Sequence, residues 1–258
     1  MQRFRERSKY AVKYQENEVN LGYDRNLREV IARADGEFLV FMGDDDVFVP
    51  GALDQFIQFL RSHREAGYVL RSYVADFAGS SPELFRYFAT SRWFEAGLDS
   101  YVLLFRKSVS LAGFTVKTAL ARANATDVFD GTLLYQLYLT AEIAINHPTA
   151  FCADPFVYAE QTFRTDNAFF GAASAESGSF VPGKVLPSNS LNFMRGFFRI
   201  TGFIDSKYGF ASTEDVRRDI SKYSYPILAI QRKRGLPTFL RYARALREAE
   251  PYFAMFPR

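Results

Sequence analysis

An apolar run that ends in three aspartates constrains the fold of this chain more than any other stretch. Residues 37–51 read EFLVFMGDDDVFVPG, so residues 38–42 lead through Gly43 into the aspartates at 44–46. The run is too short for a helix and shows no polar alternation, which is typical of a strand covered on both faces in a parallel sheet. We therefore expect a buried strand with an acidic turn at its carboxyl end.

Helical periodicity flanks this strand on both sides. Apolar residues recur at helical spacing between Asn20 and Gly36, and again from Pro50 to Gly67, where another apolar segment begins at 68–70. Alternating helices and buried strands predict an α/β sheet. Further along, we expect a helix starting at Ser81-Pro82-Glu83, a strand at 101–105 and a helix at 132–144.

Composition and charge limit the class of protein. With 258 residues, 48% of them hydrophobic, the chain can bury a full core. Its lone Cys152 excludes an internal disulfide and a cysteine-based metal cluster, and we interpret it as a core residue. No apolar run reaches the roughly 18 residues that cross a bilayer, and the start lacks the apolar middle of a secretory signal. We expect a soluble, cytoplasmic protein.

Positive charge gathers at the end of the chain. Residues 231–258 hold seven Lys or Arg against two Glu, interleaved with aromatic and aliphatic residues. We favour a solvated helix that packs one face on its own domain. The alternative is an interfacial amphipathic segment, which the pattern resembles and which implies peripheral contact with the inner face of the cytoplasmic membrane.

The adjacency of the three aspartates requires a physical explanation. Ligands of open α/β sheets bind beyond the carboxyl ends of the strands, where these side chains are expected. Adjacent carboxylates repel one another, and a hard cation such as Mg²⁺ or Mn²⁺ compensates that repulsion. The alternative is a polar turn in which Asp46 caps the following helix.

Several motifs together resemble the nucleotide-sugar half of the family 2 glycosyltransferases of the GT-A fold. They are Asn20-Leu21-Gly22, Arg25-Asn26, Ala34-Asp35-Gly36-Glu37 and the strand that ends in the aspartates, with Pro50 just beyond. The family's usual line reads N-x-G, R-N, A-x-G-E and an apolar strand ending in D-x-D. The resemblance implies an α/β fold, with a GT-A-like (Rossmann-like) mixed sheet flanked by helices and a mostly helical C-terminal extension.

The resemblance implies roles for the acidic residues. Gly43 stands where the family commonly has its first aspartate, so the triplet sits one position late. Asp45 aligns with the last motif aspartate and is the expected metal ligand for Mg²⁺ or Mn²⁺. Asp44 or Asp46 is expected as a second ligand or as the partner of the donor ribose.

Donor contacts are implied at three further positions. Arg25 matches a position that often faces the diphosphate, although an exposed helix charge is the alternative, and Asn26 is expected to brace the loop. Arg164, in Gln161-Thr162-Phe163-Arg164, partly resembles a motif of processive synthases. It is expected either to grip a phosphate or to be a surface residue.

The front of the chain departs from the family, because nothing before Asn20 matches its N-terminal nucleotide-binding strands. We therefore divide the chain into a GT-A-like glycosyltransferase domain without those strands at 1–170, a flexible loop at 171–190 and a helical C-terminal region at 191–258. The base-binding wall is expected to be absent or supplied otherwise, which puts independent activity in doubt.

A downstream match implies the general base. Leu104–Ser108 and Ala112-Gly113-Phe114 are similar to the family's acceptor-side elements, after which the family has a Glu-Asp pair. Phe129-Asp130 occupies that place, so Asp130 is implied as the base, with Asp127 in reserve. The alternative is that either aspartate caps a helix that starts near Gly131.

Together these motifs imply an inverting glycosyltransferase that moves a sugar from a nucleotide-diphosphate donor to a saccharide or lipid-linked acceptor hydroxyl. The branch that it resembles comprises the abequosyltransferases of bacterial surface-polysaccharide synthesis. Two alternatives stay open: a catalytically inactive GT-A-like scaffold, or a binding module that acts on membranes through the basic tail. We expect no nucleic-acid partner.

Overall fold

Two β-sheets with helices around them form the part of the chain that this computed structural model describes, residues 6–8, 11–77, 81–161, 187–223, 232–233 and 235–249. The larger sheet has the order β1-β7-β3-β8-β6. Its strands are β1 (Phe38–Val40), β3 (Tyr68–Arg71), β6 (Arg92–Phe94), β7 (Phe114–Lys117) and β8 (Thr149–Cys152). Only the pair β3 and β8 is parallel, so the sheet is mixed.

The smaller sheet lies beside the acidic turn and has the order β2-β9-β4-β5. Its strands are β2 (Asp46–Phe48), β4 (Tyr73–Phe77), β5 (Glu83–Phe85) and β9 (Val157–Gln161). Here β4 and β9 are parallel, and the outer strands β2 and β5 pair antiparallel with them. The last aspartate of the triplet is therefore the first residue of a strand in this second sheet.

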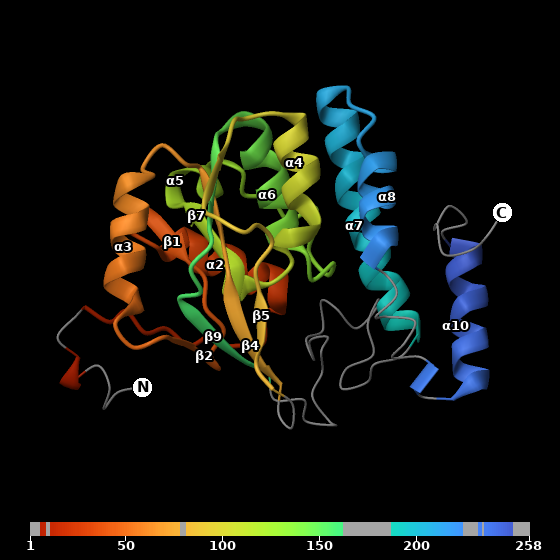
Figure 1. The fold of residues 1–258 in the computed structure, drawn as a ribbon, viewed down its shortest axis with the longest axis horizontal. Coiled ribbons are helices and arrows are strands. Elements are labelled where there is room, and N and C mark those ends of the chain that lie inside the picture. Colours follow the sequence, from red (N-terminus) through yellow and green to blue (C-terminus); the bar gives the residue numbers. More distant parts are fainter. Residues whose placement is uncertain are drawn as a thin grey trace.

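Helices cover both faces of the larger sheet (Figure 1). They are α2 (Tyr23–Arg33), α3 (Ala52–Ser62), α4 (Leu98–Phe105), α5 (Thr118–Ala123), α6 (Tyr135–Asn146), α7 (Pro187–Tyr208), α8 (Thr213–Tyr223) and α10 (Leu236–Ala249), with short 3-10 turns at Arg106–Ser108 and Leu111–Gly113. In β3, Val69 packs toward α3, whereas Tyr68 and Leu70 belong to the main core with α4 and α6. The alternation of side chains along one strand thus produces the two layers.

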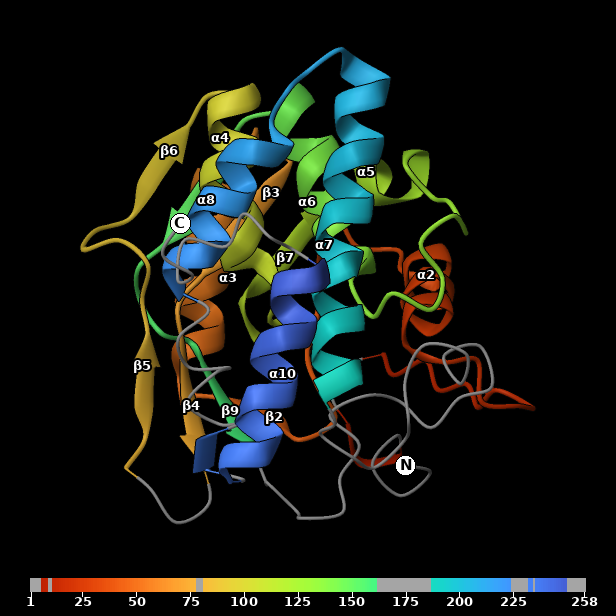
Figure 2. The ribbon, with the colours of Figure 1, turned by 90° about the vertical axis from the view of Figure 1, so that its right-hand side faces the viewer.

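Of the C-terminal helices, α7 packs against α6 and α8 against α4, whereas α10 packs on α7 (Figure 1 and Figure 2). Ile200 and Ile204 of α7, Val216 of α8 and Tyr242 of α10 belong to the same core as α6. The predicted fold class, a mixed sheet flanked by helices with a helical C-terminal region, is confirmed. Most of the predicted loop 171–190 lies outside the described residues, and α7 begins at Pro187. The division of the chain into domains stays a prediction.

Three local predictions were wrong. β1 is not a doubly covered strand of a parallel sheet: it is a half-buried edge strand that pairs only with antiparallel β7. The expected helix after Ser81 is strand β5, because residues 83–85 pair with β4. The expected strand at 101–105 belongs to helix α4, since a short apolar run cannot by itself distinguish a strand from a buried helix.

Candidate functional site

The acidic turn, residues 43–46, lies at the same end of the fold as the start of α2. Arg122 of α5, which follows β7, donates to the carbonyl oxygen of Ala32 at 3.1 Å, so the last turn of α2 lies beside the end of β7. β1 runs antiparallel to β7, and Phe41 donates its backbone N–H to the carbonyl of Phe114 at 3.2 Å. The acidic turn after β1 therefore lies near Phe114, at the start of β7. Arg122 and the last turn of α2 lie at the other end of β7, so the first turn of α2 is at the end that carries the acidic turn.

Within the acidic turn the three carboxylates differ. Asp44 and Asp45 are exposed, whereas Asp46 is half-buried and accepts the backbone N–H of Gly43 at 2.8 Å. Burial raises the pKa of Asp46; the Gly43 hydrogen bond and the charge of Arg71 oppose this, and the neighbouring aspartates reinforce it. Asp46 therefore closes the turn through its hydrogen bond with Gly43.

Gly43 lies close to the carboxylates of the two aspartates at 45 and 46. A Cβ atom at this position would lie 2.6 Å from Oδ1 of Asp45 and 3.3 Å from Cγ of Asp46. A side chain at 43 would therefore require the exposed Asp45 to turn its carboxylate aside. The alternative in which Asp46 caps α3 is wrong, because Gly51 is the N-cap of α3 and no side chain caps it.

The exposed pair Asp44 and Asp45 is suited to a hard divalent cation. No cluster of three or more His, Cys, Asp or Glu side chains with metal-binding geometry occurs among the described residues. Mg²⁺, however, is commonly held by one or two carboxylates, with substrate phosphates and water completing the shell. Two exposed carboxylates fit that pattern, and the hydrogen-bonded Asp46 does not belong to the same set.

A fully buried arginine lies beneath the turn. Arg71 donates through Nη2 to the carbonyl of Phe41 and, at 3.4 Å, to that of Leu111, and its Nε and Nη1 have no hydrogen-bond partner among the described residues. Burial lowers its pKa to about 10, against the attraction of Asp46. Arg71 therefore ties the strand end that carries the aspartates to the segment before Gly113, and neutralises part of their charge.

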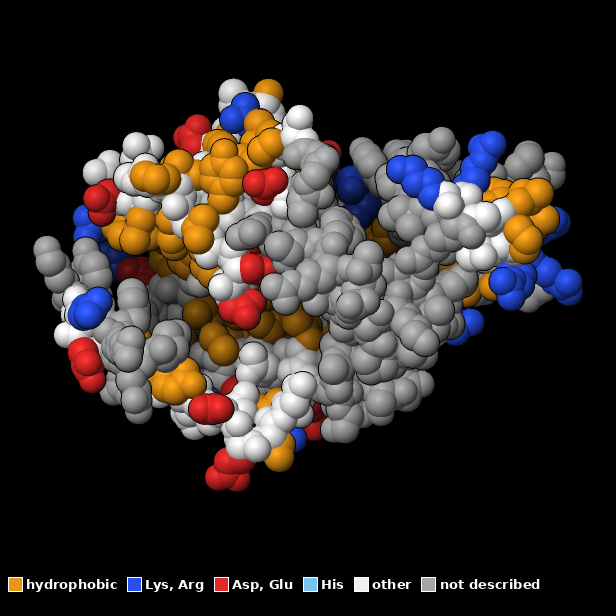
Figure 3. Space-filling view, turned by 90° about the horizontal axis from the view of Figure 1, so that it is seen from below, with side chains coloured by type: hydrophobic (Ala, Val, Ile, Leu, Met, Phe, Trp, Pro, Cys, Tyr) orange, Lys and Arg blue, Asp and Glu red, His pale blue; other side chains and the backbone are white. Residues whose placement is uncertain are grey.

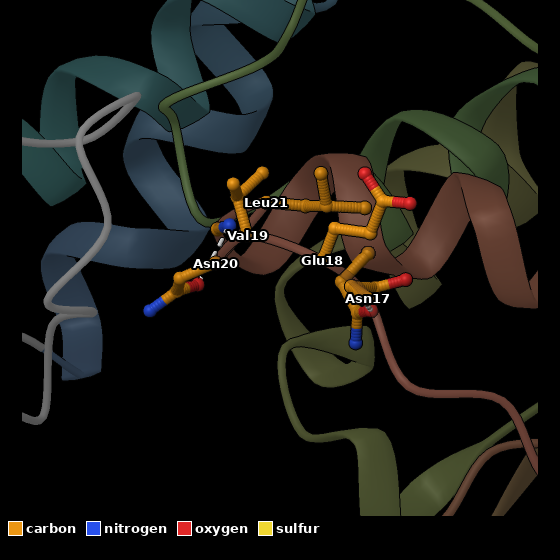
Figure 4. A pocket seen from close by; sticks show the side chains of 7 residues that line it. Asn17, Glu18, Val19, Asn20 and Leu21 are labelled. Carbon is orange, nitrogen blue, oxygen red and sulfur yellow. Dashed lines mark hydrogen bonds between the residues drawn. The ribbon is translucent and has the colours of Figure 1, made fainter.

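A polar pocket of about 330 Å³ opens before the first turn of α2. It is lined by Asn17, Glu18, Val19, Asn20, Leu21, Gly22 and Asn26 (Figure 4). Asn26 accepts a hydrogen bond from the Asn17 side chain at 2.9 Å, a contact of the kind that a bracing role requires. Arg25 is exposed on the same turn. Arg164 lies outside the described residues.

Asp130 makes the most defined polar contact among the predicted site residues. Arg28 of α2 donates through Nε to Oδ1 at 3.1 Å and through Nη2 to Oδ2. Asp127 is exposed, and its carbonyl accepts the backbone N–H of Asp130 at 3.0 Å. The chain reaches helix α6 only at Tyr135, so the alternative in which either aspartate caps a helix near Gly131 is wrong.

Asp24 supports the start of α6, a contact that the sequence alone did not indicate. Asp24, fully buried in α2, accepts the backbone N–H groups of Leu133 at 2.9 Å and Tyr135 at 3.0 Å. Leu133 has a φ of 63°, which non-glycine residues rarely adopt. Asp24 thus satisfies the donors of a strained backbone. In the sequence it resembles an ordinary acidic residue in a first helical turn.

The segment that carries Asp130, residues 126–135, is also held from the side of α7. Arg199 donates to the carbonyl of Val128, and its guanidinium lies 5.8 Å from the centre of the Phe129 ring. Phe203 meets the same ring edge-on at 5.3 Å. A Cβ at Gly196 would lie 2.8 Å from Leu134. Helix α7 therefore supports the 126–135 segment in addition to the contacts that α2 makes with it.

The structure places the predicted carboxylates in two groups, each with partners that the sequence did not indicate. One contains the acidic turn, Arg71 and the Gly113 element; the other contains Asp130, Arg28 and Asp24. Among the described residues, no hydrogen bond or ion pair joins Asp45 to Asp130.

Comparison with known protein families finds a match for the N-terminal part of the chain. Residues 1–116 match the sequence model described as "Glycosyl transferase family 2", an enzyme family. The match includes α2, the acidic turn and Gly113, and it ends before Asp130. No curated protein matches the chain.

Two crystal structures of S. aureus TarS are similar to the chain at low identity. One, of TarS 1-349, shares 17% identity with a TM-score of 0.48, and the match covers 87% of this chain and 77% of that one. The other, of S. aureus TarS, shares 15% identity with a TM-score of 0.45; the match covers 80% of this chain and 41% of that one.

Proposed function

We propose that the chain is a family 2 glycosyltransferase that moves a sugar from a nucleotide-diphosphate donor to an acceptor hydroxyl with inversion at the anomeric carbon. The observation that carries the proposal is the acidic turn, which lies at the end of β1 within the family-matched segment. Exposed Asp44 and Asp45 are the residues that hold Mg²⁺ or Mn²⁺. Such a cation, when bound, neutralises charge on the departing diphosphate.

In this proposal Asp130 is the general base. Each of its oxygens accepts one bond from Arg28, and a carboxylate oxygen has a second lone pair for the acceptor hydroxyl. The proton passes to Asp130, the hydroxyl oxygen forms the new bond to the anomeric carbon, and the bond to the diphosphate breaks with its electron pair. General-base catalysis contributes roughly 10²- to 10⁴-fold.

Calorimetric titration tests the donor site. UDP, GDP, CDP and dTDP are titrated with Mn²⁺ into the wild type, Asp45→Ala and the control Asp54→Ala, which removes an exposed aspartate from the first turn of α3. We expect one nucleotide to bind the wild type and the control only with Mn²⁺, and Asp45→Ala to lose that binding. Equal binding by Asp45→Ala contradicts the ligand assignment. No binding at all favours an inactive scaffold.

A role in bacterial cell-surface polysaccharide synthesis, with a saccharide or lipid-linked acceptor, is the finer part of the proposal and rests on sequence resemblance. One surface supports membrane contact. Leu236 and Leu240 of α10 are 64% and 56% exposed, and positions 232–247 contain six Lys or Arg and no Asp or Glu (Figure 3). The cations among the described residues are Arg232, Lys233, Arg241, Arg244 and Arg247. No described helix is long and apolar enough to cross a membrane.

Vesicle sedimentation tests this contact. We expect binding to anionic phosphatidylglycerol vesicles that weakens with salt, and little binding to phosphatidylcholine. The double substitution Leu236→Asp with Leu240→Asp should abolish it, whereas Leu84→Asp, at an exposed leucine of β5, should not. Equal binding by all three proteins contradicts a contact through α10.

A further inference from the structure

Arg28 fixes the plane of the Asp130 carboxylate. Its Nε and Nη2 contact the two oxygens of Asp130 separately, and the two side chains are only 23% and 28% exposed. Because the guanidinium is a rigid planar fork, this side-on contact sets the orientation of the carboxylate as well as its position. The two partners are 102 positions apart in the sequence, so the contact is a feature of the tertiary fold.

The backbone next to Asp130 is held from the same helix. Asp24 precedes Arg28 by four residues, so both side chains lie on one face of α2. Asp24 accepts the N–H groups of Leu133 and Tyr135, while Arg28 holds the side chain of Asp130. Two successive turns of one helix therefore determine where the carboxylate lies and how it is turned.

The same helix carries the predicted donor contacts. Arg25 is exposed on its first turn, and Asn26 lines the pocket that opens before it. An α-helix of 11 residues is rigid on the scale that matters for catalysis. Helix α2 thus joins the polar pocket before its first turn to the proposed base without an intervening loop.

We propose that Arg28 is the positioning residue of the general base, and that it orients Asp130 toward the acceptor hydroxyl relative to a donor bound at the start of α2. This inference rests on the proposed function. A misplacement of about 1 Å can reduce turnover about 100-fold, so an orienting group of this kind has a measurable effect.

Donor turnover in the presence of Mn²⁺ tests the role. Release of nucleoside diphosphate from UDP-, GDP-, CDP- and dTDP-sugars is measured, with water as the acceptor, for the wild type and five variants. These are Arg28→Met, Arg28→Lys, Asp130→Asn, the double variant Arg28→Met with Asp130→Asn, and Arg33→Met. The last is a matched control, because Arg33 lies on the same helix and forms an exposed ion pair with Glu29.

We expect Arg28→Met to lose about 100-fold in turnover while binding nucleoside diphosphate as the wild type does. Arg28→Lys, which keeps the charge but loses the fork, should recover part of the loss. The double variant should be no slower than Asp130→Asn, because residues that act as a unit are not additive. Arg33→Met should match the wild type. Where Arg28→Met does not fold, Arg28→Lys carries the comparison.

The contrary outcomes separate this inference from the proposed function. A wild type that binds no nucleoside diphosphate, or binds it without turning over any sugar donor, contradicts the proposed transferase and this role with it. An active wild type with equally active Arg28 variants overturns the positioning role alone. Fully additive losses of turnover in the double variant would also overturn the positioning role. A loss of nucleoside-diphosphate affinity in Arg28→Met would overturn it too, because Arg28 would then be a donor ligand.

Discussion

The carboxylate of Asp24 accepts the backbone N–H of Tyr135 at 3.0 Å, and so supports the start of α6 from a position 111 residues earlier in the chain. Most helices are capped by a residue next to their own first turn. Here the local chain offers Leu134 at the N-cap, which has no side-chain acceptor. A buried carboxylate of α2 takes over that task, and it thereby links α2 to α6.

Removal of this carboxylate should destabilise the protein substantially. Asp24→Ala leaves two buried N–H groups without acceptors, and we expect a loss of about 2–4 kcal/mol in the free energy of unfolding. Asp24→Asn retains an acceptor oxygen and should lose less. Urea unfolding measures both, with Asp54→Ala as the control, for which we expect less than about 1 kcal/mol. A loss of that small size in Asp24→Ala would disprove the long-range cap.

A second buried carboxylate should control the docking of α7 on α6. Glu142 is fully buried and accepts hydrogen bonds from Lys207 at 2.7 and 2.8 Å and from Tyr208 at 2.6 Å. Lys207→Met should cost about 1–3 kcal/mol, because it leaves a buried charge without its counter-ion. The double variant Lys207→Met with Glu142→Gln should have a higher free energy of unfolding than Lys207→Met alone, because the buried charge is removed.

A double-mutant cycle by urea unfolding measures this coupling. Arg218→Met is the control, because its ion pair with Asp215 is exposed on α8. Additive losses in the cycle would mean that Lys207 and Glu142 do not stabilise each other.

Asp205 should make stability depend on pH in the acid range. Burial alone would raise its pKa, but four hydrogen bonds from the backbone and hydroxyl groups of Ser212 and Thr213 lower it below the ordinary value of 3.8. A carboxylate with a lowered folded-state pKa stabilises the fold above its unfolded pKa, and this contribution is lost as the pH falls below 3.8 toward the folded pKa.

The gap in unfolding free energy between the wild type and Asp205→Asn should therefore be constant from neutral pH down to about 5 and then close below the unfolded pKa. Unfolding in urea at a series of pH values measures it. A gap that stays the same size down to the acid limit would show that the charge of Asp205 is not what matters.

Two glycines should respond in opposite directions to alanine. A Cβ at Gly67 would lie 2.7 Å from Ile143, 2.8 Å from His147 and 2.9 Å from Leu120, so Gly67→Ala should cost about 1–3 kcal/mol through overpacking. Gly202, in α7, has nothing within 4 Å of that position. Gly202→Ala should stabilise by about 0.5–1 kcal/mol through helix propensity. Thermal unfolding measures both, and equal shifts would refute the packing argument.

Local sequence signals predicted much of the frame of the site. The spacing of apolar residues located α2 and α3, and the apolar run before the aspartates located β1. The segment at 101–105 was harder, since five apolar residues satisfy a strand as well as the buried face of α4. Pairing partners were not predictable either, because the edge position of β1 depends on β7, more than 70 residues later.

The polar contacts of the candidate site were beyond local signals for the same reason. Asp24 and Arg28 look like ordinary charges on a helix surface, and only the folded chain shows that both contact the 126–135 segment. Arg71 reads as the end of an apolar strand, and nothing local indicates that its guanidinium lies beneath the acidic turn. Sequence motifs located the candidate carboxylates but not the groups that hold them.

The close fit between Gly196 of α7 and Leu134 has a consequence for evolution and engineering. A helical tail borrowed from a relative would have to bring its own small residue to this crossing, or leave a bulky side chain wedged against the loop beneath Asp130. Exchange of C-terminal regions between this chain and a relative should therefore succeed only when the matching loop is transferred with the helix.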